Sequence, residues 1–581
     1  MKRLLILFWC SIQMIPVHAQ TNYFFTNPNI EGILKGNYNP VLYNPNPTYS
    51  PKNTVINGLF SGVSKDSLMK CLSTLATFTT RNTASDTTSN SFGIGAARRW
   101  AHLQFERFSV QNQNRLQVSY FQFDKLICSA TQHRNIMAVL PGSDTSEKEF
   151  VLIEAHIDTR CESVCDTLCL AQGMEDNGSG TSLVLELARV LSPYTFKRSL
   201  VFILSIGEEQ GLDGADAFAR YAKANNLKIR AVFNNDIVGG IICGKTSSPP
   251  GCPMENDIDS INVRIFSAGS NYSTHKGLAR FIKLEFEEEM KPKMAVKTQV
   301  NIMNAEDRTG RGGDHIKYKE QGYTAIRFTS ANEHGDANPQ AGYADRQHST
   351  RDVLGNDFNN DGILDSFFVN TGYLQRNCWL NGTAAITAAD GPGAPDFDLV
   401  NDGNGLSVII KNPIPPFNYR VGFRTRKNDF DSLFTLNNQT DLKTYHVKKD
   451  SFYFVSVAAV GIDGTESLFA SEKYVKVLNV PPSGLSNMAQ EEKTMQLLPV
   501  SPNPVDETLS LSVWVKYPDS HKKGMIEIMD MQGKTVKQLP ISLSQEINEV
   551  LFEHGFNARG LYHCILFVDG LAIDTQKIFF K

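Results

Sequence analysis

The 581-residue sequence predicts an α/β domain, with a mixed, mostly parallel sheet flanked by helices, followed by two small all-β sandwich domains. Two observations support this. Between about residues 135 and 330, apolar runs alternate with stretches of helical periodicity, which is typical of a sheet covered on both faces. Beyond residue 395, short alternating runs are separated by Gly, Asp and Asn turns, which is typical of small sandwiches.

The α/β domain is expected to span residues 61–390. Its strand-like runs lie at residues 135–140, 150–155, 199–206, 230–235, 262–267, 295–302 and 324–329. Its helical stretches lie at residues 65–78, 181–191, 214–225, 275–290, 316–321 and 371–388. The last of these helices is expected to close the domain.

The N-terminus has the pattern of a secretory signal peptide. Lys2 and Arg3 precede an apolar run, and Ala19 ends a small-residue cleavage pattern. This run is too short to span a bilayer and no later run is long enough, so we expect cleavage at residues 1–19 and no membrane span. Residues 20–60 are rich in Asn, Pro and Tyr, which predicts an extended lead-in.

The composition changes near residue 390. A Gly- and Pro-rich linker at residues 391–395 precedes the first expected sandwich, at residues 395–480. A second linker begins at residue 481, and residues 496–581 again have an all-β pattern.

Charge and cysteine content narrow the class of protein. The formal net charge is −4, so the chain lacks the excess of basic residues that is usual for a protein that binds nucleic acid.

Nine cysteines remain after the signal peptide, and an exported protein can form disulfides. Cys243 and Cys252 flank a Pro/Gly-rich loop and are expected to pair. Cys161, Cys165 and Cys169 lack a second Cys/His pair at zinc-finger spacing, so disulfides are expected there too, with one thiol of the nine left free.

Most candidate functional residues lie where a predicted strand ends. In an open α/β sheet, ligands bind at the carboxyl ends of the strands, so residues far apart in sequence can converge there. One further candidate opens a helix, and another lies in a polar loop. The candidates are His156, Asp158, Asp176, Glu208, Glu209, Asp236 and His348.

Each candidate has an ordinary alternative explanation. A histidine after a strand is often structural, Asp176 could be a helix cap, and Glu208–Glu209 could be a solvated acidic turn. Together they supply two histidines, three carboxylates and one spare carboxylate. That set suits two metal ions that share a ligand ~3.5–4 Å apart. Nitrogen and oxygen donors without thiolate favour zinc, for which manganese or cobalt could substitute.

The motifs His-x-Asp, Asp-Asn-x-Ser-Gly, Glu-Glu, Asn-x-Asp and a late His, in this order, resemble the secreted bacterial di-zinc aminopeptidases of metallopeptidase clan MH. The resemblance covers about residues 60–390 and implies a zinc-exopeptidase fold that acts on peptides. It implies that Asp176 bridges both zincs, that His156 and Asp236 complete one site, and that Glu209 and His348 complete the other. It also implies that Asp158 orients His156 and that Glu208 is the general base for a metal-bridged water.

Three positions depart from that family's usual pattern. Glu154 stands where Gly is usual, and Glu175 replaces a common Asp. Gln347 precedes His348 where some relatives have a Tyr, so the group that stabilises the oxyanion is not assigned. Asp314-His315 and Arg327 border the substrate pocket in relatives and are expected to be structural or to support the residues that bind metal. Asp357–Asp365 resembles a calcium loop but lacks Glu at position twelve, so a solvated loop is the favoured interpretation.

The two C-terminal modules also carry resemblances. Residues 395–480 are similar to a fibronectin type III sandwich, and residues 496–581 are similar to the C-terminal sorting domain of type IX secretion. These imply a gliding-type outer-membrane bacterium, the type IX machinery as a partner, and a protein that is secreted or attached to the cell surface after export.

Two other functions remain open on the same fold. Glutaminyl cyclases keep much of this ligand set, and activity on an N-terminal glutamine would identify one. A metal-free binding protein would have lost ligands, and this sequence shows none missing.

Overall fold

The structure is a computed structural model of the chain. It describes residues 21–43, 50–244, 250–308, 311–332, 346–401, 405–425, 428–444, 447–448, 451–477, 494–500, 503–505, 508–532, 534–553 and 559–580. The signal peptide predicted at residues 1–19 lies outside these ranges.

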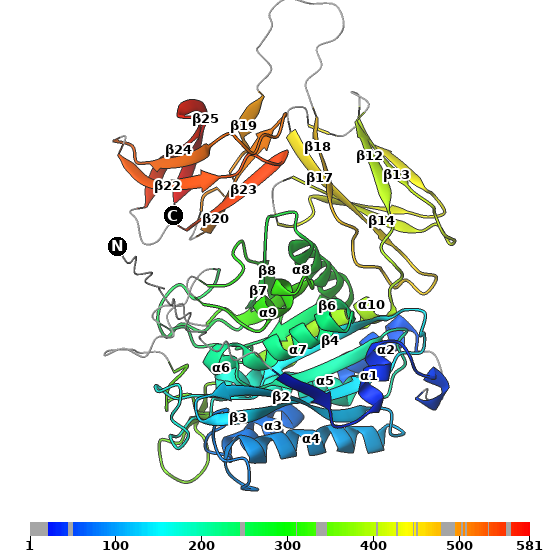
Figure 1. The fold of residues 1–581 in the computed structure, drawn as a ribbon, viewed down its shortest axis with the longest axis vertical. Helices are drawn as coiled ribbons and strands as arrows, with labels where there is room; N and C mark the ends of the chain where they lie inside the picture. Colours follow the sequence, from blue (N-terminus) through cyan, green and yellow to red (C-terminus); the bar gives the residue numbers. More distant parts are fainter. Residues whose placement is uncertain are drawn as a thin grey trace, which may run out of the picture.

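A nine-stranded sheet in the order β1-β2-β3-β5-β4-β6-β9-β7-β8 forms the centre of the first domain (Figure 1). Its strands are β1 (Thr21–Phe25), β2 (Gln117–Ile127), β3 (Ala130–Leu140), β4 (Glu149–His156), β5 (Ser199–Ser205), β6 (Lys228–Asn235), β7 (Asn262–Ser267), β8 (Gln299–Ile302) and β9 (Ala325–Ser330). The sheet is mixed as predicted, because β4 pairs in parallel with β5 and β6, and β6 with β9, while β1, β2 and β3 add antiparallel strands. Strand β4 lies in its middle and is almost wholly buried.

Helices cover both faces of this sheet. They are α1 (Asn29–Leu34), α2 (Lys52–Gly62), α3 (Lys65–Ala76), α4 (Gly93–Gln111), α5 (Ser179–Leu191), α6 (Glu208–Gly211), α7 (Asp213–Ala224), α8 (Thr274–Glu285), α9 (His315–Glu320) and α10 (Thr371–Asp390). Helix α10 is buried along most of its length and packs on α2, α3, α5 and α8. It closes the domain, as the sequence predicts.

The prediction of an extended lead-in at residues 20–60 is wrong. Strand β1 pairs with β2 at the edge of the main sheet, and α2 packs against α10 and α5. Val55, Ile56 and Leu59 recur at helical spacing and are buried in the main core. The Asn and Pro residues therefore mark turns between short elements that belong to the α/β domain.

Strand β2 and helix α4 of the α/β domain were not predicted either. Ile94, Ala97, Ala101 and Phe105 form a buried stripe on α4 at the three- and four-residue spacing of a helix. The charged and polar residues between them weaken the apolar signal, because the opposite face of α4 is exposed.

Each of the two all-β regions contains a three-stranded and a four-stranded sheet. The first has β12 (Phe397–Asn401), β13 (Leu406–Ile410), β14 (Tyr419–Arg424), β15 (Ser432–Leu436), β16 (Asp441–Thr444), β17 (Ser451–Ala459) and β18 (Lys473–Val477). The second has β19 (Met495–Leu497), β20 (Thr508–Val515), β21 (Gly524–Met529), β22 (Thr535–Ile541), β23 (Ile547–Glu553), β24 (Gly560–Val568) and β25 (Leu571–Phe580). The two regions have the same strand order when the strands of each are counted from its first. In the first region the sheets are β12-β13-β16 and β15-β14-β17-β18, and in the second they are β19-β20-β23 and β22-β21-β24-β25.

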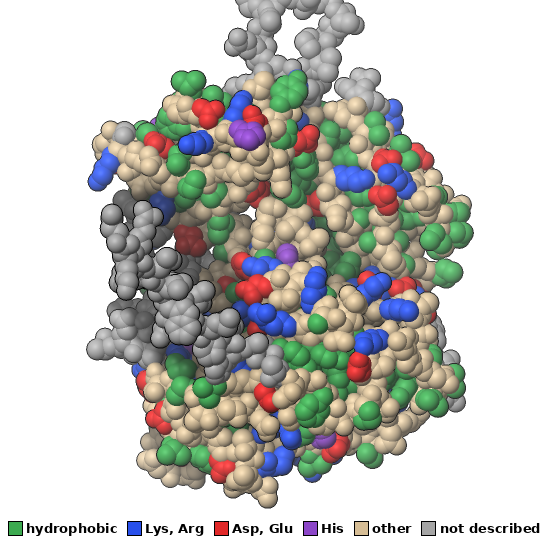
Figure 2. Space-filling model, viewed as in Figure 1, with side chains coloured by type: hydrophobic (Ala, Val, Ile, Leu, Met, Phe, Trp, Pro, Cys, Tyr) green, Lys and Arg blue, Asp and Glu red, His purple; other side chains and the backbone are tan. Residues whose placement is uncertain are grey.

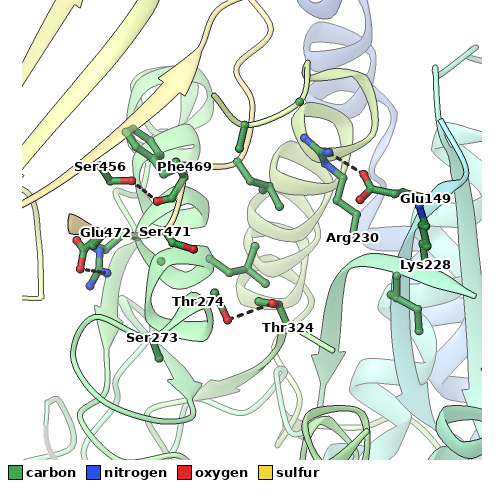
Figure 3. Close-up of a pocket in the computed structure, with 18 of the residues that line it drawn as sticks. Glu149, Lys228, Arg230, Ser273, Thr274, Thr324, Ser456, Phe469, Ser471 and Glu472 are labelled. Atoms are coloured by element: carbon green, nitrogen blue, oxygen red, sulfur yellow. Dashed lines mark hydrogen bonds and ion pairs between the residues drawn. The ribbon is translucent and has the colours of Figure 1, made fainter. Parts of the chain in front are cut away.

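Both sandwiches contact the α/β domain near the start of α8. Tyr272 stacks on Phe454 of the first sandwich, and its hydroxyl donates a hydrogen bond to the Ile547 carbonyl of the second, at 3.1 Å. A cavity of about 500 Å³ lies beside this junction, between the first sandwich and the amino ends of β6 and β9 (Figure 3). There Arg230 pairs with Glu149 at 2.9 Å and donates to the Pro392 carbonyl of the linker.

Three disulfides link loops around the sheet: Cys128–Cys165, Cys161–Cys169 and Cys243–Cys252. The predicted Cys243–Cys252 disulfide is confirmed, and so are the disulfides expected for the cysteines at residues 161–169. The expectation of one free thiol is wrong, because Cys71, Cys378 and Cys564 all remain reduced. They lie on separate elements of two different domains.

Acidic and basic side chains are interspersed over the face of the molecule seen in Figure 2, consistent with the formal net charge of −4. In the part of the chain that the structure describes, no helix is both long and apolar enough to cross a membrane.

Candidate metal centre

His156 is the last residue of β4, and its backbone and ring are both held in place. The hydroxyl of Thr181 donates to the His156 carbonyl at 3.0 Å. His156 Nδ1 lies 3.1 Å from the Asp158 carbonyl oxygen and 3.5 Å from its carboxylate, so Nε2 points into the site. A carboxylate or carbonyl behind a metal-binding imidazole fixes its tautomer, which is the role expected of Asp158.

Asp158 also organises the two adjacent glutamates. Its carboxylate lies 3.4 and 3.3 Å from the backbone N–H groups of Glu208 and Glu209, at the start of α6. The Thr83 hydroxyl donates to the same carboxylate at 3.0 Å and accepts from the Gly207 N–H at 2.9 Å. The end of β4 and the end of β5 are therefore joined through one buried carboxylate.

Asp176 lies in the turn Met174–Gly178, which precedes α5. The two carboxylate oxygens of Asp352 accept the backbone N–H groups of Glu175 and Asp176, each at 2.9 Å. Gln347 donates its side-chain amide to Asp176 Oδ2 at 2.8 Å. Two residues of the loop that carries His348 therefore position the Asp176 carboxylate.

Asp236 follows β6, and Arg327 of β9 lies beside it. Arg327 Nη2 is 2.9 Å from Asp236 Oδ2, and Nη1 lies 2.9 Å from an oxygen of Asp307. The arginine is fully buried, so it neutralises the outer oxygen of Asp236 and leaves Oδ1 toward His156. Arg327 therefore supports a candidate ligand, which is one of the two roles expected of it.

The predicted ligands form two clusters that share Asp176. His156 Nε2 lies 3.3 Å from Asp176 Oδ1 and 3.3 Å from Asp236 Oδ1. His348 Nε2 lies 3.1 Å from Asp176 Oδ2 and 3.1 Å from Glu209 Oε2. Each triad brings one donor atom per residue within the distance needed to hold a metal ion.

These separations suit zinc. Two ligand atoms ~2.0–2.1 Å from a tetrahedral zinc lie ~3.3 Å apart, which is close to the separations in both clusters. Glu209 Oε1 is buried and has no hydrogen-bond partner among the described residues, as expected for an oxygen that faces a cation. The donor set and its spacing therefore fit two zinc ions, with Asp176 between them.

The buried carboxylates of the site also favour the binding of cations. Burial raises the pKa of Glu208 well above its usual range, and the Asp236 and Glu209 carboxylates raise it further while His156 opposes them. Although burial alone would lower the pKa of His348, Glu209 and Asp176 raise it to about 9. Like charges gathered in a buried site are unfavourable unless cations neutralise them.

The Asp357–Asp365 loop does not form a comparable cluster. Asp357 accepts the backbone N–H groups of Asp361 and Gly362, at 3.2 and 2.8 Å. The potential metal clusters found among the described residues do not include this loop. The calcium site that the Asp357–Asp365 loop resembles therefore has no support.

Replacing Asp352 with Asn is expected to weaken metal binding about 10–100-fold, the usual effect of removing a partner behind a ligand. The new amide group would face one of the two N–H donors that now bind the carboxylate. Competition with a chromogenic chelator measures the affinity, and the exposed Asp66→Asn serves as the matched control. Unchanged affinity in Asp352→Asn would show that Asp352 does not position Asp176.

Residues 135–367 match the model described as Peptidase family M28. Over these residues the chain is similar to peptidase family M28. The M28 region contains all five candidate ligands as well as Asp158 and Glu208. The chain is therefore a peptidase, and its gathered nitrogen and oxygen donors are those that zinc takes.

Several curated proteins and solved structures are similar to this chain. A probable zinc metalloprotease of Leptosphaeria maculans is 27% identical over 429 residues, which is 71% of this chain and 95% of that protein. One from Pyrenophora tritici-repentis is 30% identical over 289 residues, which is 47% of this chain and 65% of that protein. The crystal structure of the Legionella pneumophila LapA aminopeptidase has a TM-score of 0.42 and 19% identity, covering 58% of this chain and 74% of that one. These two curated relatives are fungal, so they lend no support to the expected bacterial source.

Proposed function

We propose that the chain is a secreted two-zinc aminopeptidase that removes N-terminal residues from peptides. The observation that carries this proposal is the division of the Asp176 oxygens between the two triads, His156–Asp176–Asp236 and Asp176–Glu209–His348. Zinc bound by these residues would polarise the scissile carbonyl and lower the pKa of the attacking water.

The chain's own residues perform the remaining steps. Glu208 Oε2 lies 4.0 Å from His156 Nε2 and its side chain is 12% exposed, so the carboxylate lies beside the His156–Asp176–Asp236 triad. Its carboxylate takes the proton of the attacking water and then gives it to the leaving amine. Asp158 keeps His156 and the Glu208–Glu209 turn aligned during these transfers.

Removal of metal is the direct test. Chelation is expected to abolish hydrolysis of an aminoacyl-anilide, and added zinc is expected to restore it. Because ligands that bind only the folded state stabilise it, zinc at 1,000 times its Kd adds about 4 kcal/mol to the free energy of unfolding. A lower Tm after chelation, measured by calorimetry, should accompany the loss of activity. Hydrolysis that survives full chelation would refute the proposal.

An aminoacyl-anilide and a peptide with N-terminal glutamine, tested side by side, distinguish the aminopeptidase from the glutaminyl cyclase and the binding protein. A glutaminyl cyclase would release ammonia from an N-terminal glutamine peptide without cleaving the anilide. A binding protein would do neither, although it could still take up metal. Zinc content and product analysis together therefore distinguish the three functions.

The flanking modules are assigned roles within the same proposal. Residues 395–480 would act as a fibronectin type III-like spacer, and residues 496–581 would act as a sorting domain for type IX secretion. The three- and four-stranded sheets of both regions are compatible with these roles. Export of the chain with and without residues 496–581 tests the second role, since a sorting domain is required for release or surface attachment.

A further inference from the structure

We propose that Arg160 binds a carboxylate of the peptide substrate once zinc occupies the site formed by Asp176, Glu209 and His348. This inference rests on the proposed aminopeptidase function. It adds a substrate class, namely peptides with a carboxylate close to the scissile bond.

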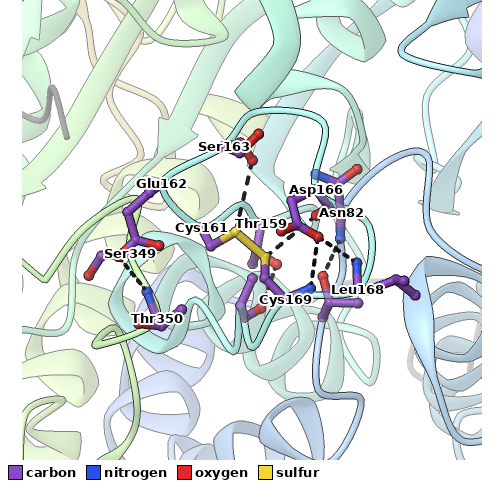
Figure 4. Close-up of a disulfide and its surroundings, with 12 residues drawn as sticks. Asn82, Thr159, Cys161, Glu162, Ser163, Asp166, Leu168, Cys169, Ser349 and Thr350 are labelled. Atoms are coloured by element: carbon purple, nitrogen blue, oxygen red, sulfur yellow. Dashed lines mark hydrogen bonds between the residues drawn. A yellow bond between two sulfur atoms is a disulfide. The ribbon is translucent and has the colours of Figure 1, made fainter. Parts of the chain in front are cut away.

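The backbone of Arg160 is fixed at the edge of the metal centre. The Thr159 hydroxyl donates to the Ala171 carbonyl at 2.7 Å and accepts the Arg81 N–H at 3.0 Å. On the other side, Cys161 is bonded to Cys169, and Figure 4 shows this disulfide beside Thr159. The loop therefore directs one arginine toward the site.

The arginine side chain contacts two candidate ligands of one metal. Arg160 Nη2 lies 2.9 Å from His348 Nδ1, and Nε lies 3.5 Å from Glu209 Oε2. The side chain is only 12% exposed, and Nε is buried without a hydrogen-bond partner. Within the described ranges, Glu209 is the only acid that forms an ion pair with Arg160.

Metal binding is incompatible with these contacts. His348 Nε2 faces Asp176 and Glu209, so the ring would bind metal through Nε2. A neutral imidazole bound in this way carries its proton on Nδ1, while a guanidinium has only donors. Two N–H groups repel each other at 2.9 Å, and the negative charge of Glu209 is then shared with the metal. Arg160 therefore loses its acceptor and most of its counter-charge.

A largely buried guanidinium without a counter-charge is unfavourable, so it favours an anion that enters the site. Its planar pair of N–H groups matches a carboxylate. Two substrate groups have this chemistry next to a scissile bond: the α-carboxylate of a dipeptide and the side chain of an acidic second residue. Both would lie within reach of an arginine at the edge of the site formed by Asp176, Glu209 and His348.

Matched substrate pairs test the proposal on the zinc-loaded, full-length protein. The first pair is Leu-Leu and Leu-Leu-amide, and the second is Leu-Glu-amide and Leu-Gln-amide. The wild type is expected to prefer the carboxylate member of one pair by about tenfold or more in kcat/KM. That ratio should fall to near one in Arg160→Gln and to an intermediate value in Arg160→Lys, which keeps the charge but not the fork. Arg107→Gln, on the exposed face of α4, should keep the wild-type ratio.

Binding provides a readout that does not depend on turnover. In zinc-loaded Glu208→Gln, calorimetry should show the same preference in Kd, and adding Arg160→Gln should remove it. A preference in the first pair identifies the α-carboxylate, and one in the second identifies an acidic side chain. Equal kcat/KM within both wild-type pairs, or a preference that survives Arg160→Gln, would overturn the proposal. Failure of the proposed function is different, because neither neutral amide would then show chelator-sensitive cleavage.

Discussion

Replacing Glu208 with Gln is expected to lower kcat by about 10²–10⁴-fold, the usual contribution of a general base. Gln has nearly the same shape but cannot accept a proton. Glu208 is outside both ligand triads, so zinc content should stay at the wild-type value. KM should change little, since Glu208 acts on the attacking water and not on the substrate's side chains.

Steady-state kinetics with an aminoacyl-anilide, beside metal analysis by mass spectrometry, measures both effects. Glu106→Gln on the surface of α4 is the matched control and should retain wild-type values of both. Full activity in Glu208→Gln would remove it as the base. Lost activity together with lost zinc would instead make Glu208 a ligand.

Replacing Asp176 with Ala is expected to remove both metals and to reduce hydrolysis below detection. Its two oxygens belong to different triads, so each cluster loses one of its three donors. Glu209→Ala, in contrast, removes a donor from only one cluster and should leave about one zinc per chain. This difference in stoichiometry is the signature of a shared carboxylate.

Metal content after dialysis against a weak chelator separates the two variants, and Asp66→Ala is the surface control. If Asp176→Ala still held one zinc firmly, the carboxylate would belong to a single site. The two-metal proposal would then need another bridging group, although a one-zinc peptidase would remain tenable.

The order and type of the metal donors could be predicted from the sequence because each donor follows a recognisable local signal. His156, Glu208 and Asp236 all come directly after or close to an apolar strand, and Asp176 precedes a helix. The fold class could be predicted from the alternation of apolar strand-like runs with helical stretches between residues 135 and 330. The lead-in at residues 20–60 was misjudged and β2 was missed, because a short edge strand and turn-rich helices have weak periodicity.

The groups that surround the donors could not be predicted in this way. Arg160 and His348 are 188 residues apart, and Asp352 lies 176 residues from the Asp176 N–H that it accepts. Arg327 was expected to be structural or to support the metal ligands, but the sequence did not indicate that its partner is the outer oxygen of Asp236. No local pattern predicts such pairs, because a single hydrogen bond between two loops produces no residue periodicity in the sequence of either loop.

By itself, the sequence determined which atoms are available to bind metal and at which edge of the sheet they gather, since strand direction and residue type suffice for both. Only the tertiary structure decided that the two oxygens of Asp176 face different histidines and that arginines lie beside Asp236 and Glu209. The physical reason is that side-chain direction and charge pairing depend on how distant loops pack, and that packing is a property of the whole folded chain.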